Sequence, residues 1–90
     1  MNILIIGGTS GIGFGLAKNL VLNNNLFIGS RTSSDVSRCI DELSSVKKNE
    51  VSVYGETLEA SSFDSVERFI GKAYKKLNSI DVIINCSGSI

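Results

Sequence analysis

The chain has 90 residues and makes at most one small domain, because ordinary domains hold about 100–150 residues. Nine lysines and arginines balance nine aspartates and glutamates, and histidine is absent, which argues against a nucleic-acid-binding or membrane-binding surface. The apolar content of 42% supports a folded core and excludes a disordered chain.

The first two elements follow from a change in hydrophobic spacing. Asn2–Ile6 is a short apolar run that ends at two glycines, which is typical of a strand buried on both faces of a parallel sheet. The next stretch repeats apolar residues every three or four positions, which predicts a helix that the asparagines at 23–25 end. The apolar residues on its predicted face are Ile12, Leu16, Ala17, Leu20 and Val21.

The second strand is predicted at Leu26–Gly29. The polar residues 30–34 form a loop in which Ser33 or Ser34 caps a second helix. One face of that helix is apolar, so Cys39 on this face is most simply a small core side chain. The apolar residues of the face are Val36, Cys39, Ile40 and Leu43.

The third strand is predicted at Val51–Tyr54, followed by a loop over residues 56–61. Ser61 and Asp64 have the spacing of a capping box at the start of a long helix, Ser62–Leu77. The fourth strand is predicted at Ile80–Asn85. The apolar stripe of the long helix contains Phe63, Val66, Ile70, Ala73 and Leu77, and Phe69 and Tyr74 widen it.

Four strands that alternate with three helices predict βαβ units with right-handed crossovers and a parallel sheet. This is the pattern of an α/β doubly wound (Rossmann) sheet, which orders about six strands as 3-2-1-4-5-6. Here the pattern stops after the fourth strand. We therefore interpret residues 1–90 as the N-terminal part of one dinucleotide-binding domain, with the remainder outside this chain.

A glycine-rich loop, residues 7–13 (GGTSGIG), joins the first strand to the first helix. Such a loop brings backbone N–H groups and a helix N-terminus to a pyrophosphate. Gly7 permits the tight turn, Gly11 lets the backbone approach the phosphates, and Gly13 allows the helix to pack closely on the sheet. The motif is not G-x-G-x-x-G, because Leu16 takes the place of the third glycine, and the lysine of a P-loop is missing. A turn that binds nothing is the alternative.

The spacing G-x-x-x-G-x-G resembles the glycine motif T-G-x-x-x-G-I-G of the short-chain dehydrogenases/reductases, with Ile6 where threonine is usual. Two further segments are similar to motifs of that family. Residues 85–88 (NCSG) resemble N-N-A-G at the end of the fourth strand, and Glu59-Ala60 resembles the acidic pair that meets the adenine. All 90 residues follow the order of the family's N-terminal part.

Arg31 indicates which dinucleotide is bound. In this fold an acidic residue about 20 positions past the glycine loop accepts hydrogen bonds from the ribose 2′-hydroxyl and selects NAD. No acidic residue precedes Asp35 here, and the guanidinium of Arg31 can bind a 2′-phosphate bidentately. Ser30, Thr32 and Ser33 add hydroxyl donors. In the family that the chain resembles, such an arginine marks a preference for NADP; a solvated loop arginine is the alternative.

The residues expected at the cofactor come from all these segments. They are Gly7, Thr9, Ser10, Gly11, Ile12, Gly13, Ser30, Arg31, Thr32, Glu59, Ala60, Asn85, Ser87 and Gly88. Cys86 lies inside the NCSG segment, but nothing nearby in the sequence supplies a base for a reactive thiol.

The resemblance implies hydride transfer between nicotinamide and a carbonyl or alcohol carbon, with a tyrosine as acid/base and a lysine four residues later. Neither tyrosine has that lysine: Leu58 follows Tyr54 and Asn78 follows Tyr74 at this spacing. We therefore assign no catalytic residue. Residues 1–90 alone are expected to be inactive.

The sequence and the resemblance thus favour the NADP-binding portion of an oxidoreductase that acts on a small carbonyl or alcohol substrate. The resemblance also implies a homo-oligomer with Phe69 and Tyr74 at a contact between subunits; burial of these side chains by the remainder of the domain is the equal alternative. A stand-alone dinucleotide-binding module and a non-functional truncated reading frame stay open. Cys39 and Cys86 lack metal-ligand spacing, so no metal is expected. No apolar run approaches the ~20 residues of a membrane helix and no signal-peptide pattern is visible, which favours the cytoplasm.

Overall fold

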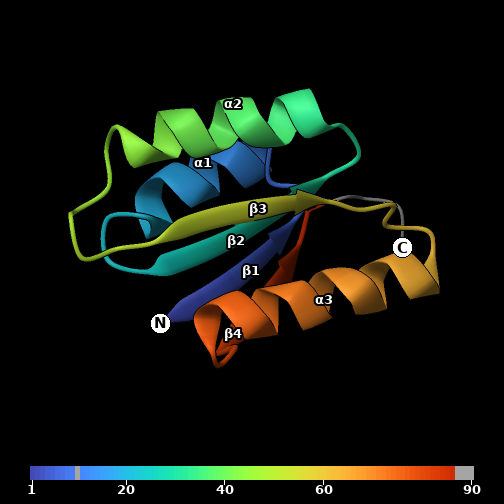
Figure 1. The fold of residues 1–90 in the computed structure, drawn as a ribbon. Coiled ribbons are helices and arrows are strands. Elements are labelled where there is room, and N and C mark those ends of the chain that lie inside the picture. The colour runs from blue at the N-terminus through green and yellow to red at the C-terminus, as the bar shows by residue number, and fades with distance from the viewer. Residues whose placement is uncertain (10, 87–90) are drawn as a thin grey trace.

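A computed structural model of the chain describes residues 1–9 and 11–86. Its strands form one parallel sheet in the order β3-β2-β1-β4, which confirms the predicted α/β doubly wound arrangement. The elements are β1 (Asn2–Ile6), α1 (Gly11–Leu20), β2 (Asn25–Ser30), α2 (Ser33–Ser44), β3 (Val53–Thr57), α3 (Phe63–Leu77) and β4 (Val82–Asn85). Helices α1 and α2 cover one face of the sheet and α3 covers the other (Figure 1).

The central strand β1 is buried on both of its faces, as its continuous apolar run predicts. Ile3 and Ile5 pack into the core beneath α1 and α2, whereas Leu4 and Ile6 pack into the core beneath α3. All four side chains are at most 3% exposed. Alternation along the strand therefore divides one apolar run between two cores.

The core beneath α3 is centred on Phe69, which is 1% exposed. Its ring meets the ring of Phe27 on β2 edge-to-face, with centroids 5.1 Å apart and planes at 72°. A Cβ built on Gly29 would lie 2.5 Å from Phe69, so the ring occupies the space that this glycine leaves. Tyr74 and Phe63, which also belong to the apolar stripe of this helix, are 58% and 78% exposed in residues 1–90, so the sheet covers only part of the stripe.

Replacement of Phe69 by alanine in the natural protein is expected to lower the free energy of unfolding by about 3–5 kcal/mol, because it removes a buried ring and leaves a cavity. Phe63→Ala is the matched control: it is the same substitution on the same helix at an exposed position, and its effect should stay within about 0.5 kcal/mol. Denaturant unfolding of both variants measures the difference. Equal effects would contradict the assignment of Phe69 to the core.

Strand β3 differs from its prediction at both ends. It begins at Val53 and extends to Thr57, through residues 56 and 57 that were predicted as loop. Parallel pairing with β2, from Leu26 opposite Val53 to Ser30 opposite Thr57, sets these bounds. In the described sheet β3 is an edge strand, where polar side chains are tolerated, so polarity at its end was a poor guide to where pairing stops.

The helix caps also differ from the predictions. The N-cap of α3 is Ser62, whose hydroxyl accepts a hydrogen bond from the backbone N–H of Ser65 at 3.3 Å, so the capping box at Ser61 is wrong by one residue. Helix α2 already begins at Ser33, with Thr32 at its N-cap position. The hydroxyl of Thr32 donates to the carboxylate of Asp35 at 2.7 Å and makes no bond to the helix backbone.

The asparagines at 23–25 do not form the left-handed cap predicted for the first helix. Helix α1 ends at Leu20, before the asparagines, and Asn25 already belongs to β2. The left-handed cap occurs at Asn78, which has φ 70° and closes α3 with a bond from its N–H to the carbonyl of Tyr74 at 2.8 Å. Within residues 1–9 and 11–86, none of the helices combines the length and the apolar character that crossing a bilayer requires.

Candidate cofactor-binding site

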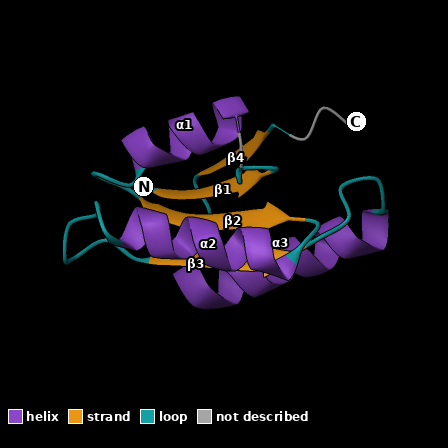
Figure 2. Cartoon of the chain, turned by 90° about the horizontal axis from the view of Figure 1, so that it is seen from above, coloured by secondary structure: helices purple, strands orange, loops and turns teal. Residues whose placement is uncertain are grey.

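The candidate site lies where the four parallel strands end. Their carboxyl ends point to the same edge of the sheet (Figure 2). The glycine loop follows β1, Ser30 ends β2, Glu59 follows β3 by two residues, and Asn85 ends β4. Strand β1 pairs with β2 on one side and with β4 on the other, so the strand order reverses direction between β1 and β4. Ligands of doubly wound sheets bind at such a switch point.

The glycine loop has the backbone shape that its sequence predicts. Gly7 and Gly11 have φ angles of 79° and 57°, in the left-handed region where other residues are strained. A Cβ on Gly11 would meet no atom within 4 Å, which leaves room for a ligand beside the backbone. A Cβ on Gly13 would lie 2.8 Å from the carbonyl oxygen of Gly7 and 3.2 Å from the Cβ of Cys86. Glycine at position 13 therefore lets α1 approach the strand ends.

Thr9 in this loop makes hydrogen bonds to β2 and α2. It is 6% exposed, and its hydroxyl donates to the hydroxyl of Ser30 at 3.1 Å, so two predicted site residues meet. Its carbonyl oxygen accepts from Arg38 Nη2 at 3.1 Å and from Cys39 Sγ at 3.3 Å. No pattern in the sequence points to Arg38, which occupies the polar face of an amphipathic helix and resembles any solvated arginine.

Cys39 has no exposed surface. Burial raises the pKa of its thiol above the ordinary value; the Arg38 guanidinium opposes this rise, and the carboxylates of Glu42 and Asp35 add to it. The structure thus agrees with the interpretation of Cys39 as a core side chain, to which it adds the hydrogen bond to Thr9.

We expect iodoacetamide to modify the half-buried Cys86 well before Cys39 at neutral pH, because Cys39 is inaccessible and holds its proton more tightly. Mass spectrometry of labelled peptides, with denatured protein as control, measures the labelling order. Faster labelling of Cys39 would contradict its burial.

The raised pKa of Cys39 keeps its thiol protonated in the folded protein at a pH where the thiol of the unfolded protein ionises. The free energy of unfolding should therefore fall as the pH rises past the ordinary thiol pKa of about 8.5.

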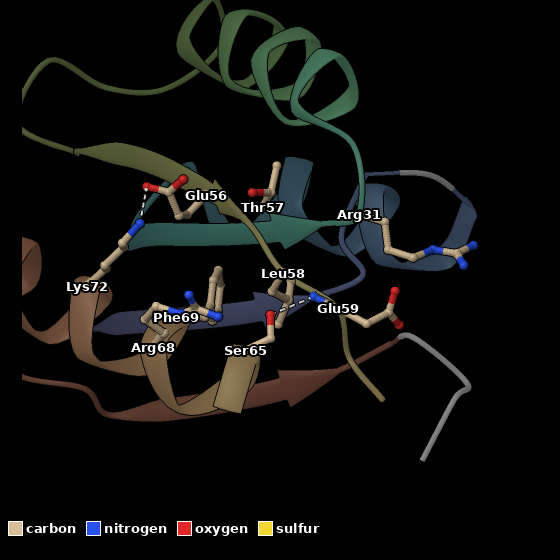
Figure 3. Close-up of a pocket in the computed structure, with 9 residues that line it drawn as sticks. All are labelled: Arg31, Glu56, Thr57, Leu58, Glu59, Ser65, Arg68, Phe69 and Lys72. Carbon is tan, nitrogen blue, oxygen red and sulfur yellow. Dashed lines mark hydrogen bonds and ion pairs between the residues drawn. The ribbon is translucent and has the colours of Figure 1, made fainter. Parts of the chain in front are cut away.

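Beside the strand ends, a cavity of about 290 Å³ opens between β3 and α3 (Figure 3). The side chains of Arg31 and Glu59 extend past the strand ends in this view. Two of the lining residues, Glu56 and Lys72, form an ion pair at 3.4 Å. The cavity is lined by Arg31, Glu56, Thr57, Leu58, Glu59, Ser65, Arg68, Phe69 and Lys72.

Arg31 is exposed and makes no hydrogen bond or ion pair with any residue that the structure describes. Its guanidinium is therefore available to an anionic ligand. Thr32 is less available, because its hydroxyl already donates to Asp35. Arg68, which the sequence did not suggest, lines the same cavity from α3.

The remaining predicted residues lie at or near the same edge. The Glu59 N–H donates to the hydroxyl of Ser65 at 2.8 Å and its carboxylate accepts from Ser61 at 2.9 Å, while Ala60 packs against the core beneath α3. Asn85 pairs with Ile6 in the sheet register. Ile12 is 89% exposed, so its place on the buried face of α1 is wrong. The predicted residues Ser10, Ser87 and Gly88 lie outside the described residues.

Comparison with known proteins shows which family and which proteins this chain is similar to. A family model described as short chain dehydrogenase matches residues 1–90. The chain is 34% identical over 86 residues to a putative ketoacyl reductase of the monensin polyketide synthase from Streptomyces virginiae, covering 94% of this chain and 32% of that protein. It is 36% identical over 85 residues to a 3-oxoacyl-(acyl-carrier-protein) reductase of Buchnera aphidicola, covering 93% of this chain and 32% of that protein.

Solved structures agree. A short-chain type dehydrogenase/reductase from Mycobacterium ulcerans superposes with a TM-score of 0.88 at 23% identity, over 94% of this chain and 31% of that one, which shows the fold. An actinorhodin polyketide ketoreductase with NADPH superposes with a TM-score of 0.85 at 25% identity, over 93% of this chain and 31% of that one. The chain spans about a third of the length of the curated relatives it matches. The match of the family model over all 90 residues shows that the chain belongs to the short-chain dehydrogenase family.

Proposed function

We propose that residues 1–90 form the NADP(H)-binding portion of an oxidoreductase that transfers hydride between nicotinamide and the carbonyl or alcohol carbon of a small molecule. The observation that carries this proposal is the pairing of a glycine loop at the N-terminus of α1 with Arg31, the exposed arginine just after β2. The named activities of two relatives, both ketoacyl reductases, support a carbonyl substrate.

The residues present fit a dinucleotide. Open space at Gly11 and the close approach at Gly13 make a cradle that longer side chains would fill or distort. Backbone N–H groups of this loop and the N-terminus of α1 would hold the pyrophosphate. Ala60 and the carboxylate of Glu59 would lie near the adenine. Asn85, at the end of β4, would lie nearer to the nicotinamide.

Arg31 supports NADP over NAD. Its guanidinium matches the geometry and charge of a 2′-phosphate, which a carboxylate at this position would repel. Ser30 adds a hydroxyl, although it already accepts a hydrogen bond from Thr9. The bound NADPH of the actinorhodin ketoreductase structure is in keeping with this preference.

When bound, NADPH would supply the hydride. The part of the protein described here would bind and orient that cofactor, and the tyrosine and lysine that move the proton would come from residues outside 1–90. Cytoplasmic location and homo-oligomer formation stay predictions from the sequence.

Hydride transfer is tested by adding NADPH and a small 3-oxoacyl thioester to the full-length natural protein and following the loss of nicotinamide absorbance. We expect turnover that requires both components. Residues 1–90 expressed alone serve as the control and should show none. Saturable NADPH binding without turnover on any carbonyl would favour the stand-alone binding module.

A further inference from the structure

The carbonyl oxygen of Thr9, inside the glycine loop, is held by α2. Arg38 Nη2 donates to it at 3.1 Å and Cys39 Sγ donates at 3.3 Å. These donors lie 29 and 30 residues away in sequence, on a helix that follows the next strand. Two contacts from a separate element therefore converge on one peptide group of the loop.

Arg38 is itself fixed on α2. Its guanidinium lies 3.6 Å from the carboxylate of Asp35 and 3.7 Å from that of Glu42, one turn before and one turn after it on the helix. The opposite face of α2 is anchored in the core by Val36, Cys39 and Leu43, which are at most 5% exposed. The donor thus belongs to a helix that is packed on the sheet.

The loop needs such a contact. Gly7 and Gly11 flank Thr9 and both adopt positive φ, and glycine loses more backbone freedom than any other residue when it is ordered. A loop that must be ordered when a ligand binds loses affinity by the cost of that ordering. Contacts that order the loop in advance remove this cost.

We propose that Arg38 is a positioning residue that holds the glycine loop in its ligand-binding shape through the carbonyl of Thr9. This inference rests on the proposed binding of a dinucleotide at the loop. It assigns Arg38 a role different from that of Arg31, because the loop would hold the pyrophosphate, which NAD and NADP share, whereas Arg31 would bind the group in which they differ.

The variants that test this role are Arg38→Ala, Arg38→Lys and, as the matched control, Glu42→Gln. Arg38→Ala should weaken the binding of NADPH and of NADH by a similar factor, about 5- to 20-fold, and leave their ratio unchanged. Arg38→Lys keeps a cationic donor and should recover much of the loss. Glu42→Gln removes one ion pair but keeps the bond to Thr9, so its affinity should stay within about twofold of the natural protein.

A second readout needs no ligand. Hydrogen exchange of the loop amides, followed by mass spectrometry of the full-length natural protein, should speed up in Arg38→Ala, while exchange in β1 and β2 stays unchanged. Loop exchange equal to that of the natural protein would overturn the proposal whether or not a dinucleotide binds. A loss confined to NADPH would also overturn it, since Arg38 would then be a ligand of the 2′-phosphate. If the natural protein binds no dinucleotide but Arg38→Ala still speeds up loop exchange, the proposed function is refuted, whereas the role of Arg38 in holding the loop is supported.

Discussion

Gly13→Val is expected to abolish dinucleotide binding by the natural protein. A Cβ at this position would lie 2.8 Å from the Gly7 carbonyl oxygen and 3.1 Å from the Gly8 Cα, both of which are backbone atoms that cannot rotate away. Valine would therefore push α1 away from the strand ends or force the loop into another shape. Either change displaces the N–H donors that would hold the pyrophosphate.

Gly15→Val is the matched control, because a Cβ on Gly15 meets no atom within 4 Å although it lies on the same helix. We expect this variant to bind NADPH with nearly the affinity of the natural protein. Circular dichroism establishes that both variants are folded, and calorimetric titration compares their affinities. A folded Gly13→Val protein with unaltered affinity would show that the loop is only a turn.

Arg31→Asp is expected to shift the preference of the natural protein from NADP towards NAD. The substitution would remove the charge-assisted hydrogen bonds that we propose between Arg31 and the 2′-phosphate, which would be worth about 1.5–3 kcal/mol, or roughly 10- to 150-fold in affinity. It also introduces a carboxylate, which repels the phosphate and can accept hydrogen bonds from a ribose 2′-hydroxyl. NADP affinity should therefore fall while NAD affinity is kept or improved.

Arg68→Asp separates a specific contact from the general charge of the cavity, since Arg68 lines the same cavity from α3. The control should change the ratio of NADP to NAD affinity far less than Arg31→Asp does. Titration of both dinucleotides against both variants gives the two ratios. An unchanged ratio in Arg31→Asp would reject its assignment to the 2′-phosphate.

The fold could be predicted from the sequence because local spacing and topology agree. The apolar run Asn2–Ile6, the three-and-four spacing of α1 and α3, and the alternation of elements lead to a parallel sheet with few possible orders. The glycine loop could be found for the same reason, since its sequence encodes its backbone shape at Gly7 and Gly11.

What could not be predicted depends on partners far away in the sequence. Strand pairing with β2 sets the bounds of β3, and Phe69 is buried against Phe27 on β2 whereas Tyr74 on the same helix is exposed. The contact between Arg38 and Thr9 joins residues 29 positions apart. No local pattern distinguishes such an arginine from one that only faces water.

We propose that this glycine loop and Arg31 together bind NADP(H). Calorimetric titration of the full-length natural protein with NADPH and with NADH tests it most directly. We expect saturable binding of NADPH at least about tenfold tighter than that of NADH, as charge-assisted bonds to the 2′-phosphate require. Failure to bind either dinucleotide, or tighter binding of NADH, would contradict the claim.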